Sequence, residues 1–520
     1  MSKTVRIAAA VIVAVLCLLF FVNPAGRLNR DSRLIAVDAP FDMPSLVVPS
    51  FAHRIIDIRD HGAAPDANTP NTAAFAGAIA ACEKAGGGRV VVPAGTWLTG
   101  PIHLKSDVNL HLQTGAEIIF STDLDDYLPP VFTRYEGKEC YNYSPLVYAN
   151  NCTNIAVTGP GKLNGRAKRW WRFNRSSATR LYEMARENVP VKDRVFGTEA
   201  DGLRPSFLQT INCRNVLLEG FTITDGPMWT IHPVYCENVI VQNITLHTHG
   251  PNGDGVNPDS CKNVLVENCR FDTSDDGMGI KSGMDHDGRR VGRPCENIVV
   301  RNCTFGLGAG CDGVLSIGSD MSGDVRNVYI HDCTFDKTVR ALRIKSKRGR
   351  GGIVENIFVE NITVGRVGGD ALLLNMFYAS DPTSPLGEHA PIFRNIHIKN
   401  LTCEHTRQAI KIAGLPDSPV RNVTLENIKI TAEKGLTCKN AAGLLLKNVE
   451  ITPEQAPVID LENTCDVHIT NSACPAPVEL FLKLTGPKTK NIRLTENNLK
   501  NAKTKVQKDT SVPANALIHE

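Results

Sequence analysis

The stretch Asn263-Val-Leu-Val-Glu-Asn-Cys-Arg-Phe271 shows the pattern on which most of this chain is built. An asparagine opens it, a short run of β-branched and apolar residues follows, and a second asparagine comes before a small residue and an aromatic one. Similar runs recur along the chain. Their opening asparagines are residues 154, 215, 238, 297, 327, 356, 395, 422 and 448. Spacings that lie mostly between 23 and 39 residues indicate a repeat protein.

Each run alternates apolar and polar residues over a few positions, which is typical of a β-strand. Helical periodicity is nearly absent after residue 90. Leucine-rich repeats would place leucine at fixed positions, and propeller blades would need longer, four-stranded units. We therefore predict an all-β protein, a single-stranded right-handed parallel β-helix in which each repeat forms one coil. The asparagines would lie at bends in left-handed geometry and stack into a ladder.

A helix is predicted between Thr69-Pro70 and Gly86-Gly87-Gly88, because proline suits a first helical turn and glycine follows a last one. Phe75, Ile79 and Cys82 would share one face of this helix. Such a helix can cap the N-terminal end of a solenoid, where strand edges would otherwise be exposed. We expect a capping helix at this position.

The N-terminus has the features of an export signal. Lys3 and Arg6 precede an apolar stretch at residues 7–22, and residues 1–26 are therefore assigned to a signal peptide or an N-terminal membrane anchor. The stretch is longer than most signal cores and short for a membrane span, so both alternatives stay open. We expect an exported protein, periplasmic or secreted, that is either released or anchored to the membrane through residues 7–22.

The rest of the chain divides into three parts. A proline-punctuated linker is predicted at residues 27–53, the β-helix at 54–498, and a polar C-terminal tail at 499–520. The formal net charge of +3 over 520 residues is too small to indicate nucleic acid as a partner. We expect a monomer.

The chain has 16 cysteines, but their positions do not indicate a metal site. Cys269, Cys303 and Cys333 occupy the same position in successive repeats, so we interpret them as a ladder of small apolar side chains inside the solenoid. No pair of cysteines has zinc-finger spacing. His247 and His249 form a His-x-His motif, interpreted as exposed loop histidines because the sequence shows no third ligand. We predict no metal site.

Charged residues recur in one sector of the repeat. Counted from the opening asparagine of each unit, Asp254 is at +16, Asp275 and Asp276 at +12 and +13, Arg343 at +16 and Lys345 at +18. Because stacked coils lie about 4.8 Å apart, these side chains would gather into one patch. Carboxylates that lie so close cannot all ionise freely, so one would keep its proton and act as an acid while the others act as bases. Arg343 and Lys345 would point to one face and bind a carboxylate of the substrate.

Several motifs resemble glycoside hydrolase family 28, the polygalacturonases and their relatives. They are Asn252-Gly-Asp-Gly255, Asp275-Asp276 and Arg343-Ile-Lys345 in this order, with Gly88-Arg-Val-Val-Val-Pro-Ala-Gly-Thr-Trp97, Cys140-Tyr-Asn-Tyr-Ser-Pro145, Asn257-Pro-Asp-Ser-Cys261 and Leu342-Arg-Ile-Lys-Ser346. The resemblance covers roughly residues 54 to 450, and the details are most similar to the bacterial exo-acting branch. It implies a glycosidase that acts on a pectic polysaccharide or oligogalacturonide of the plant cell wall.

The resemblance also implies roles. Asp275 would protonate the glycosidic oxygen, and Asp254 and Asp276 would activate water in an inverting hydrolysis of α-1,4-galacturonosyl bonds. No metal or organic cofactor is implied. The candidate substrate-binding residues are Arg343, Lys345, Tyr378, Asn252 and Asp312.

One motif departs from the family. Its Gly-His-Gly sequence falls at Cys311-Asp312-Gly313, where the histidine is missing. Rhamnogalacturonan-cleaving members also lack it, so a hydrolase of rhamnogalacturonan or another uronic-acid polymer is the first alternative. A pectate lyase-like eliminase and a non-catalytic glycan-binding solenoid are further alternatives. His249 is one candidate replacement for the missing histidine.

An insert at residues 168–201 exceeds a minimal coil. We expect it to close one end of the substrate cleft and to favour cleavage from the chain end. Trp170-Trp171 within it is interpreted as packing on the solenoid flank rather than as a sugar-stacking pair.

Overall fold

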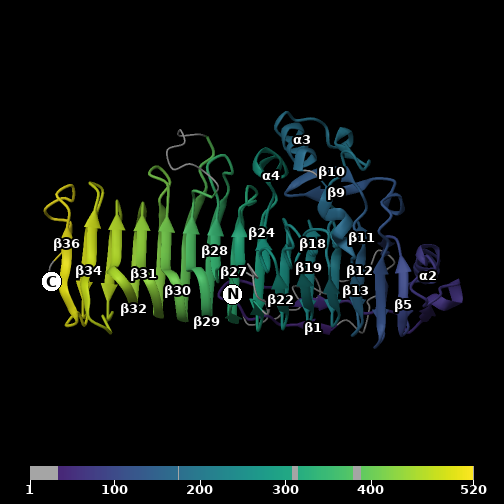
Figure 1. The fold of residues 1–520 in the computed structure, drawn as a ribbon, viewed down its shortest axis with the longest axis horizontal. Coiled ribbons are helices and arrows are strands. Elements are labelled where there is room, and N and C mark those ends of the chain that lie inside the picture. Colours follow the sequence, from purple (N-terminus) through teal and green to yellow (C-terminus); the bar gives the residue numbers. More distant parts are fainter. Residues whose placement is uncertain (1–32, 174, 307–313, 379–387, 519–520) are drawn as a thin grey trace, which may run out of the picture.

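The computed structural model describes residues 33–173, 175–306, 314–378 and 388–518, and it is an elongated right-handed parallel β-helix (Figure 1). The coils stack along the long axis from the blue N-terminal end to the yellow C-terminal end. Consecutive coils pair in parallel through continuous ladders, as β16 (Arg214–Glu219) does with β19 (Glu237–Gln242). The predicted fold class is confirmed.

Three parallel sheets run along the solenoid. The long sheet contains β3 (Ile55–Asp57), β4 (Gly88–Val92), β7 (Val108–Leu112), β12 (Thr153–Thr158), β16, β19, β21 (Lys262–Glu267) and β24 (Cys295–Arg301). The short sheet contains β5 (Gly95–Thr99), β8 (Ala116–Phe120), β13 (Lys162–Asn164), β17 (Thr222–Thr224), β20 (Thr245–Thr248), β22 (Arg270–Thr273) and β25 (Thr304–Phe305). The third, called the site sheet, contains β6 (Ile102–His103), β11 (Val147–Asn150), β15 (Leu208–Ile211), β18 (Ile231–Val234), β23 (Met278–Ile280), β26 (Leu315–Gly318) and β28 (Leu342–Lys345).

Towards the C-terminus the coils become more regular, and single strands bend through more than one sheet. These are β27 (Val325–Phe335), β29 (Ile353–Asn375), β30 (Ile392–Ala413), β31 (Val420–Lys439) and β32 (Ala441–Glu462). The final coils are formed by β33 (Cys465–Thr470), β34 (Val478–Thr485), β35 (Lys490–Thr495), β36 (Ala502–Lys508) and β37 (Leu517–Ile518). The segment predicted as a polar tail therefore adds two short strands to the solenoid.

The predicted asparagine ladder is present. The opening asparagines have φ near +55°. The side-chain amides of most of them donate to the side-chain oxygen of the preceding one, as Asn297 Nδ2 does to Asn263 Oδ1 at 2.9 Å. The prediction was wrong at Asn448, which belongs to a second ladder and donates to Asn427 at 2.8 Å. Gly443, with φ +74°, takes the expected place because glycine also adopts left-handed geometry without strain.

Substituting Asn297 tests the ladder. Asn297→Ala removes bonds to Asn263 and Asn327 and leaves a residue with a Cβ at φ +59°. We expect the free energy of unfolding to fall by about 2–3 kcal/mol, measured by denaturant unfolding. Asn297→Gly also loses the bonds but relieves the left-handed strain, so it should be about 1 kcal/mol less destabilised than the alanine variant. If both variants lose the same free energy of unfolding, the left-handed backbone at residue 297 does not contribute to the difference, and the prediction is contradicted.

The interior of the solenoid is filled by aligned apolar side chains. Cys269, Cys303 and Cys333 are buried free thiols in successive coils, which confirms the predicted cysteine ladder. Burial, followed by the neighbouring thiols of Cys269 and Cys333, raises the pKa of Cys303 well above its ordinary value. Two positions further on, three phenylalanine rings stack with centroids 4.6 Å apart, namely Phe271, Phe305 and Phe335. These cysteines therefore act as core residues.

The predicted capping helix is α2 (Thr72–Lys84), which begins two residues after Pro70. Its buried face includes Phe75, Ile79 and Cys82, as expected. The buried side chain of Asn71, just before the helix, donates to Leu98 O at 3.1 Å and so ties the cap to β5. Figure 1 shows α2 at the N-terminal end of the stack.

Residues 33–51, within the predicted linker, pack against the solenoid. β1 (Arg33–Ile35) pairs antiparallel with β2 (Leu46–Val48), and Val37 and Leu46 contact a row of outward-facing apolar side chains on the long sheet, namely Ala156, Leu217, Ile240, Leu265 and Val299. Val47 exchanges two hydrogen bonds with the Asn238 side chain. The apolar outer row explains why this segment packs.

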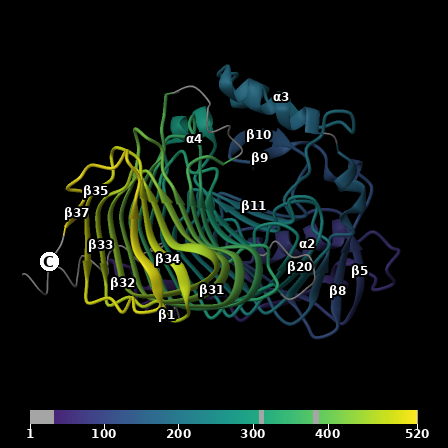
Figure 2. The same cartoon turned by 60° about the vertical axis from the view of Figure 1, so that its left-hand side comes forward.

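A layer of helices and short strands rises above the solenoid (Figures 1 and 2). We call it the insert layer; it comprises β9 (Val131–Tyr135), β10 (Lys138–Asn142), η3 (Ala167–Arg172), α3 (Arg175–Arg186), η4 (Val191–Asp193), β14 (Val195–Phe196) and α4 (Asp285–Val291). The short η2 (Asp125–Tyr127) contacts η3 through the rings of Tyr127 and Trp170. A further 3-10 helix, η1 (Ile58–His61), lies near α2. None of the helices in the described ranges is long and apolar enough to cross a membrane.

Candidate active site

The five charged residues singled out in the sequence come from three coils within a run of four successive coils. Asp254 lies in the turn that leads from the short sheet to the site sheet, and Asp275 and Asp276 lie in the corresponding turn of the next coil. The Gly255 N–H donates to the Asp276 carbonyl at 3.0 Å, which places these turns in neighbouring rungs. Arg343 and Lys345 lie on β28, two coils further on through β26.

Asp276 is an ionised carboxylate held by cations. Lys345 Nζ donates to its Oδ2 at 2.8 Å, the Ser316 hydroxyl donates to its Oδ1 at 2.9 Å, and Arg343 Nη2 lies 4.0 Å from Oδ1. Burial alone would raise the pKa of Asp276, but the charges of Lys345, Lys281 and Arg343 outweigh burial and lower it. Asp276 therefore supplies a buried negative charge over most of the pH range.

Asp254 has the opposite electrostatic environment. It is almost fully buried, and Lys281 Nζ lies 3.6 Å from its Oδ2 without forming a hydrogen bond. Burial and then the neighbouring charge of Asp275 raise the pKa of Asp254 well above its ordinary value, and Lys281 offsets only part of this. The sequence analysis made Asp254 a base together with Asp276, whereas burial raises the pKa of Asp254 and the neighbouring cations lower that of Asp276.

Asp275 is the most exposed of the three carboxylates. Its side chain is half-buried, whereas those of Asp254 and Asp276 are buried. One oxygen accepts a hydrogen bond from the Asp276 backbone N–H at 2.9 Å, and the Thr273 hydroxyl donates to its carbonyl at 2.9 Å. These bonds fix the turn and leave the Asp275 carboxyl at the surface of the cluster.

The cationic pair meets the aromatic ring of Tyr378, which the sequence analysis named as a substrate-binding candidate. The Arg343 guanidinium lies 5.6 Å and the Lys345 ammonium 5.3 Å from the ring centroid of Tyr378. Arg343 Nε is buried and has no hydrogen-bond partner among the described residues. A buried donor of this kind is suited to a carboxylate ligand. The structure thus brings Arg343, Lys345 and Tyr378 together beside Asp276.

Lys281 belongs to the same cluster, and the sequence analysis did not single it out. It is buried, and its ammonium lies 4.5 Å from the Trp229 ring centroid. Burial alone would lower the pKa of Lys281, but Asp254 and Asp276 raise it above its ordinary value. In the sequence, the apolar Met278 and Ile280 alternate with Gly279 and Lys281. This strand pattern predicts that Lys281 points out of the solenoid core, and it could have identified Lys281 as a candidate.

Asn252 and Asp312 are the remaining substrate-binding candidates from the sequence. The Asn252 side-chain oxygen accepts from Arg204 Nη2 at 2.6 Å, so this residue holds the turn that precedes Asp254. Asn252 also has φ +53°, which suits an asparagine in a tight turn. Asp312 lies outside the described residues.

The tryptophan pair packs as expected. Trp170 is buried, with edge contacts to Tyr127 and Tyr143, and Trp171 Nε1 donates to the Gly226 carbonyl at 3.0 Å. His249, the suggested replacement for the missing family histidine, lies 2.9 Å from Asp272.

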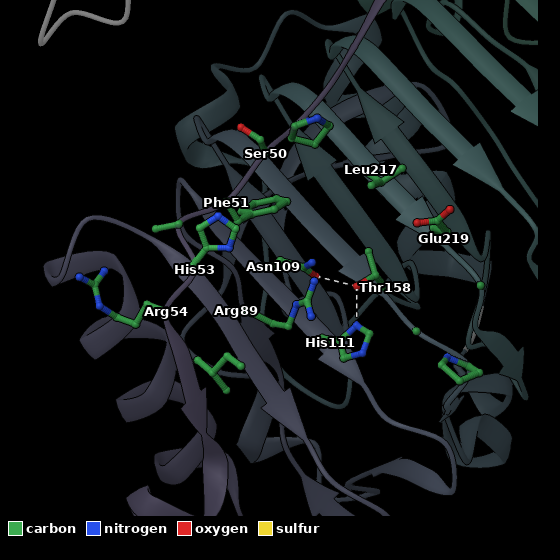
Figure 3. Close-up of a pocket in the computed structure, with 16 residues that line it drawn as sticks. Ser50, Phe51, His53, Arg54, Arg89, Asn109, His111, Thr158, Leu217 and Glu219 are labelled. Carbon is green, nitrogen blue, oxygen red and sulfur yellow. Dashed lines mark hydrogen bonds between the residues drawn. The ribbon is translucent and has the colours of Figure 1, made fainter. Parts of the chain in front are cut away.

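A pocket of about 610 Å³ lies on the long sheet, where residues 49–55 cross it (Figure 3). Its polar centre is Thr158, which donates to Asn109 at 2.9 Å and contacts His111 Nδ1 at 2.8 Å. The lining includes none of the carboxylates described above. The acid–base cluster is therefore separate from this pocket.

The fold and the cluster together define a class of protein. A parallel β-helix carries one carboxyl whose pKa is raised by burial, one whose pKa is lowered by cations, and a cationic pair beside them. Paired carboxyl groups with opposite protonation states are the arrangement that glycosidases use.

Comparisons with known proteins agree with this class. Residues 82–452 match the glycosyl hydrolases family 28, and the chain belongs to this family. It is a glycosidase. A Vitis vinifera protein named "Probable polygalacturonase" is 29% identical over 71% of this chain and 73% of its own length. A Dickeya chrysanthemi exo-poly-alpha-D-galacturonosidase is 26% identical over 69% of this chain and 64% of its own length. The crystal structure of a hyperthermoactive exopolygalacturonase from Thermotoga maritima has a TM-score of 0.71 and 40% identity, over 81% of this chain and 93% of that one.

Proposed function

We propose that this protein is exported and that it hydrolyses α-1,4-galacturonosyl bonds in pectin-derived polymers or oligomers, with inversion and from the chain end. The observation that carries the proposal is the position of Arg343 and Lys345 beside the ionised Asp276 and against Tyr378. A uronic acid residue brings a carboxylate to the site of cleavage, and this pair can bind it. The names of the relatives from Dickeya chrysanthemi and Thermotoga maritima support the same substrate.

The three carboxylates have distinct roles in this proposal. Asp275, the most exposed, donates a proton to the glycosidic oxygen. Burial and then the charge of Asp275 raise the pKa of Asp254 well above its ordinary value, so Asp276 rather than Asp254 is assigned the role of base. Asp276 stays ionised and activates the attacking water. As the sugar leaves, Arg343 and Lys345 keep its carboxylate in place.

Cleavage from the chain end is supported by the insert layer. Leu181 of α3, Phe196 of β14 and Cys140 of β10 share a buried cluster with Trp229, and Trp229 contacts Lys281, which lies beside Asp254. The layer is therefore packed directly against one side of the acid–base cluster. A polymer that ran on past this side would meet the layer, whereas a chain end would not.

Product analysis tests the proposal. The purified protein is incubated with polygalacturonate and, separately, with de-esterified rhamnogalacturonan, each with and without EDTA, and reducing ends and product sizes are followed. We expect monogalacturonate from polygalacturonate as the first product, without oligomers of intermediate size. Early oligomers would contradict exo action, and unsaturated products that require calcium would favour the lyase alternative.

Rhamnogalacturonan or another uronic-acid polymer is the second candidate substrate, favoured by Asp312 at the place of the family histidine. Cleavage of de-esterified rhamnogalacturonan with no product from polygalacturonate would select it. A protein that binds polygalacturonate but releases no product from either polymer would favour the non-catalytic alternative.

A further inference from the structure

Two histidines lie on the outer surface near the acid–base cluster and have no role in the hydrolysis described above. His247 is on β20 and His249 follows it by two residues, so both side chains lie on the same side of the strand. Their ring centroids are 4.8 Å apart. The side chains of His247 and His249 are 57% and 37% exposed, which leaves both open to a small ligand.

The structure supplies the third ligand that the sequence did not show. Asp272 on β22 is the register partner of His247 in the next coil. Its Oδ2 lies 2.5 Å from His247 Nδ1, and its Oδ1 lies 2.9 Å from His249 Nε2. Potential ligand atoms from all three residues lie within 4.8 Å of one another.

The carboxylate of Asp272 is incompletely satisfied. Its side chain is only 10% exposed, and Oδ1 accepts no hydrogen bond from the described residues although it lies close to His249. A buried carboxylate oxygen without a hydrogen bond is unfavourable unless a cation or a donor reaches it. The two imidazoles reach the two oxygens from the side that is open to solvent, and a cation bound among them would satisfy Oδ1.

We propose that His247, His249 and Asp272 bind one divalent transition-metal ion of the zinc type. Two imidazole nitrogens and one carboxylate oxygen are ligands that zinc prefers, whereas calcium and magnesium prefer oxygen alone. Tetrahedral zinc with bonds of about 2.1 Å separates its ligand atoms by about 3.4 Å. The contacts of Asp272 with His247 and His249, at 2.5 and 2.9 Å, are shorter than this separation, so the side chains would have to rotate apart to admit the ion. The exposed side leaves a position for water.

The position of this site connects it to the hydrolase centre. Asp272 precedes Asp275 by three residues, and His249 precedes Asp254 by five. The Ser274 N–H already joins the two turns by donating to the Thr248 carbonyl at 3.0 Å. A bound ion would fasten the same two turns from outside, so it would stabilise the segments that carry the carboxylates without contacting the reacting atoms.

Zinc titration of the full-length protein tests the proposal. After tag removal and dialysis against EDTA followed by metal-free buffer, isothermal titration with zinc chloride should show one saturable site per chain. Cobalt(II) should give visible absorption bands from the same site. Asp272→Asn and His249→Ala should each weaken zinc binding by about tenfold or more. His53→Ala, which removes an exposed histidine elsewhere on the surface, should leave binding unchanged.

A second measurement covers the case in which Asp272→Asn folds poorly. His247→Gln changes an exposed side chain, and zinc should raise the unfolding temperature of the wild-type protein but not that of this variant. Zinc that binds wild-type protein and the His247→Gln and His249→Ala variants equally would overturn the proposal, as would the lack of a saturable site in wild-type protein. Neither result depends on hydrolysis, so failure here is distinguishable from failure of the proposed function.

Discussion

Asp275→Asn should lower turnover on polygalacturonate by about 10³-fold or more, because asparagine cannot donate the proton that the leaving oxygen needs. The substitution keeps the size of the side chain, and its amide oxygen can still accept the Asp276 N–H at this turn. Substrate affinity should change little, since Arg343, Lys345 and Tyr378 are untouched. The measurement is initial rate by reducing ends, with binding followed by titration of an oligogalacturonide.

Asp126→Asn is the matched control. Asp126 is an exposed aspartate of η2, outside the site cluster, and its substitution should leave kcat and KM unchanged. If Asp275→Asn retains more than about a tenth of wild-type turnover, another group must supply the proton. Asp254, whose pKa is raised by burial and by Asp275, would then be the first candidate for the acid.

Lys345→Met should lower kcat/KM by about 10²–10³-fold and also change the pH profile. Asp276 must be ionised to act as a base, and Lys345 is the main charge that lowers the pKa of Asp276 against the effect of burial. Without Lys345 this pKa rises, so activity on the acidic side should be lost at higher pH than in wild type. A shift of the acid limb by about one to three pH units is expected.

The pH profile separates this role from simple substrate binding. A residue that only bound the substrate carboxylate would change KM and leave the acid limb where it is. Lys447→Met is the control, because Lys447 pairs with Glu426 at 3.0 Å in an exposed salt bridge and should affect neither parameter. An unshifted acid limb in Lys345→Met, with the protein folded, would contradict the assignment of Asp276 as the ionised base.

The repeat architecture was predictable because each coil repeats the same local chemistry. Asparagine at a left-handed bend and an alternating strand recur at similar spacing, so the fold follows from a pattern in the chain. The position of Asn448 was predicted wrongly because two asparagines per coil can head a run, and only strand register distinguishes them. Residues 33–51 were interpreted as a linker because the apolar outer row they cover is spread over five coils, one residue in each.

The site was partly predictable for the same reason. Phase within the repeat placed Asp254, Asp276 and Lys345 together, but it could not show which carboxyl keeps a proton, since that depends on burial and on Lys281. Trp229, the aromatic partner of Lys281, contacts the insert layer, which interrupts the repeat and leaves no periodic signal. Asp272 as a partner of His247 also required the strand register.

The central claim is that these carboxylates hydrolyse a galacturonosyl bond with inversion. Time-resolved proton NMR of the first product released from an oligogalacturonide tests it most directly, because the anomeric proton reports the configuration before mutarotation. An α-linked substrate should yield the β-anomer first, with no unsaturated product. The α-anomer as the first product, or an unsaturated uronate, would contradict the account.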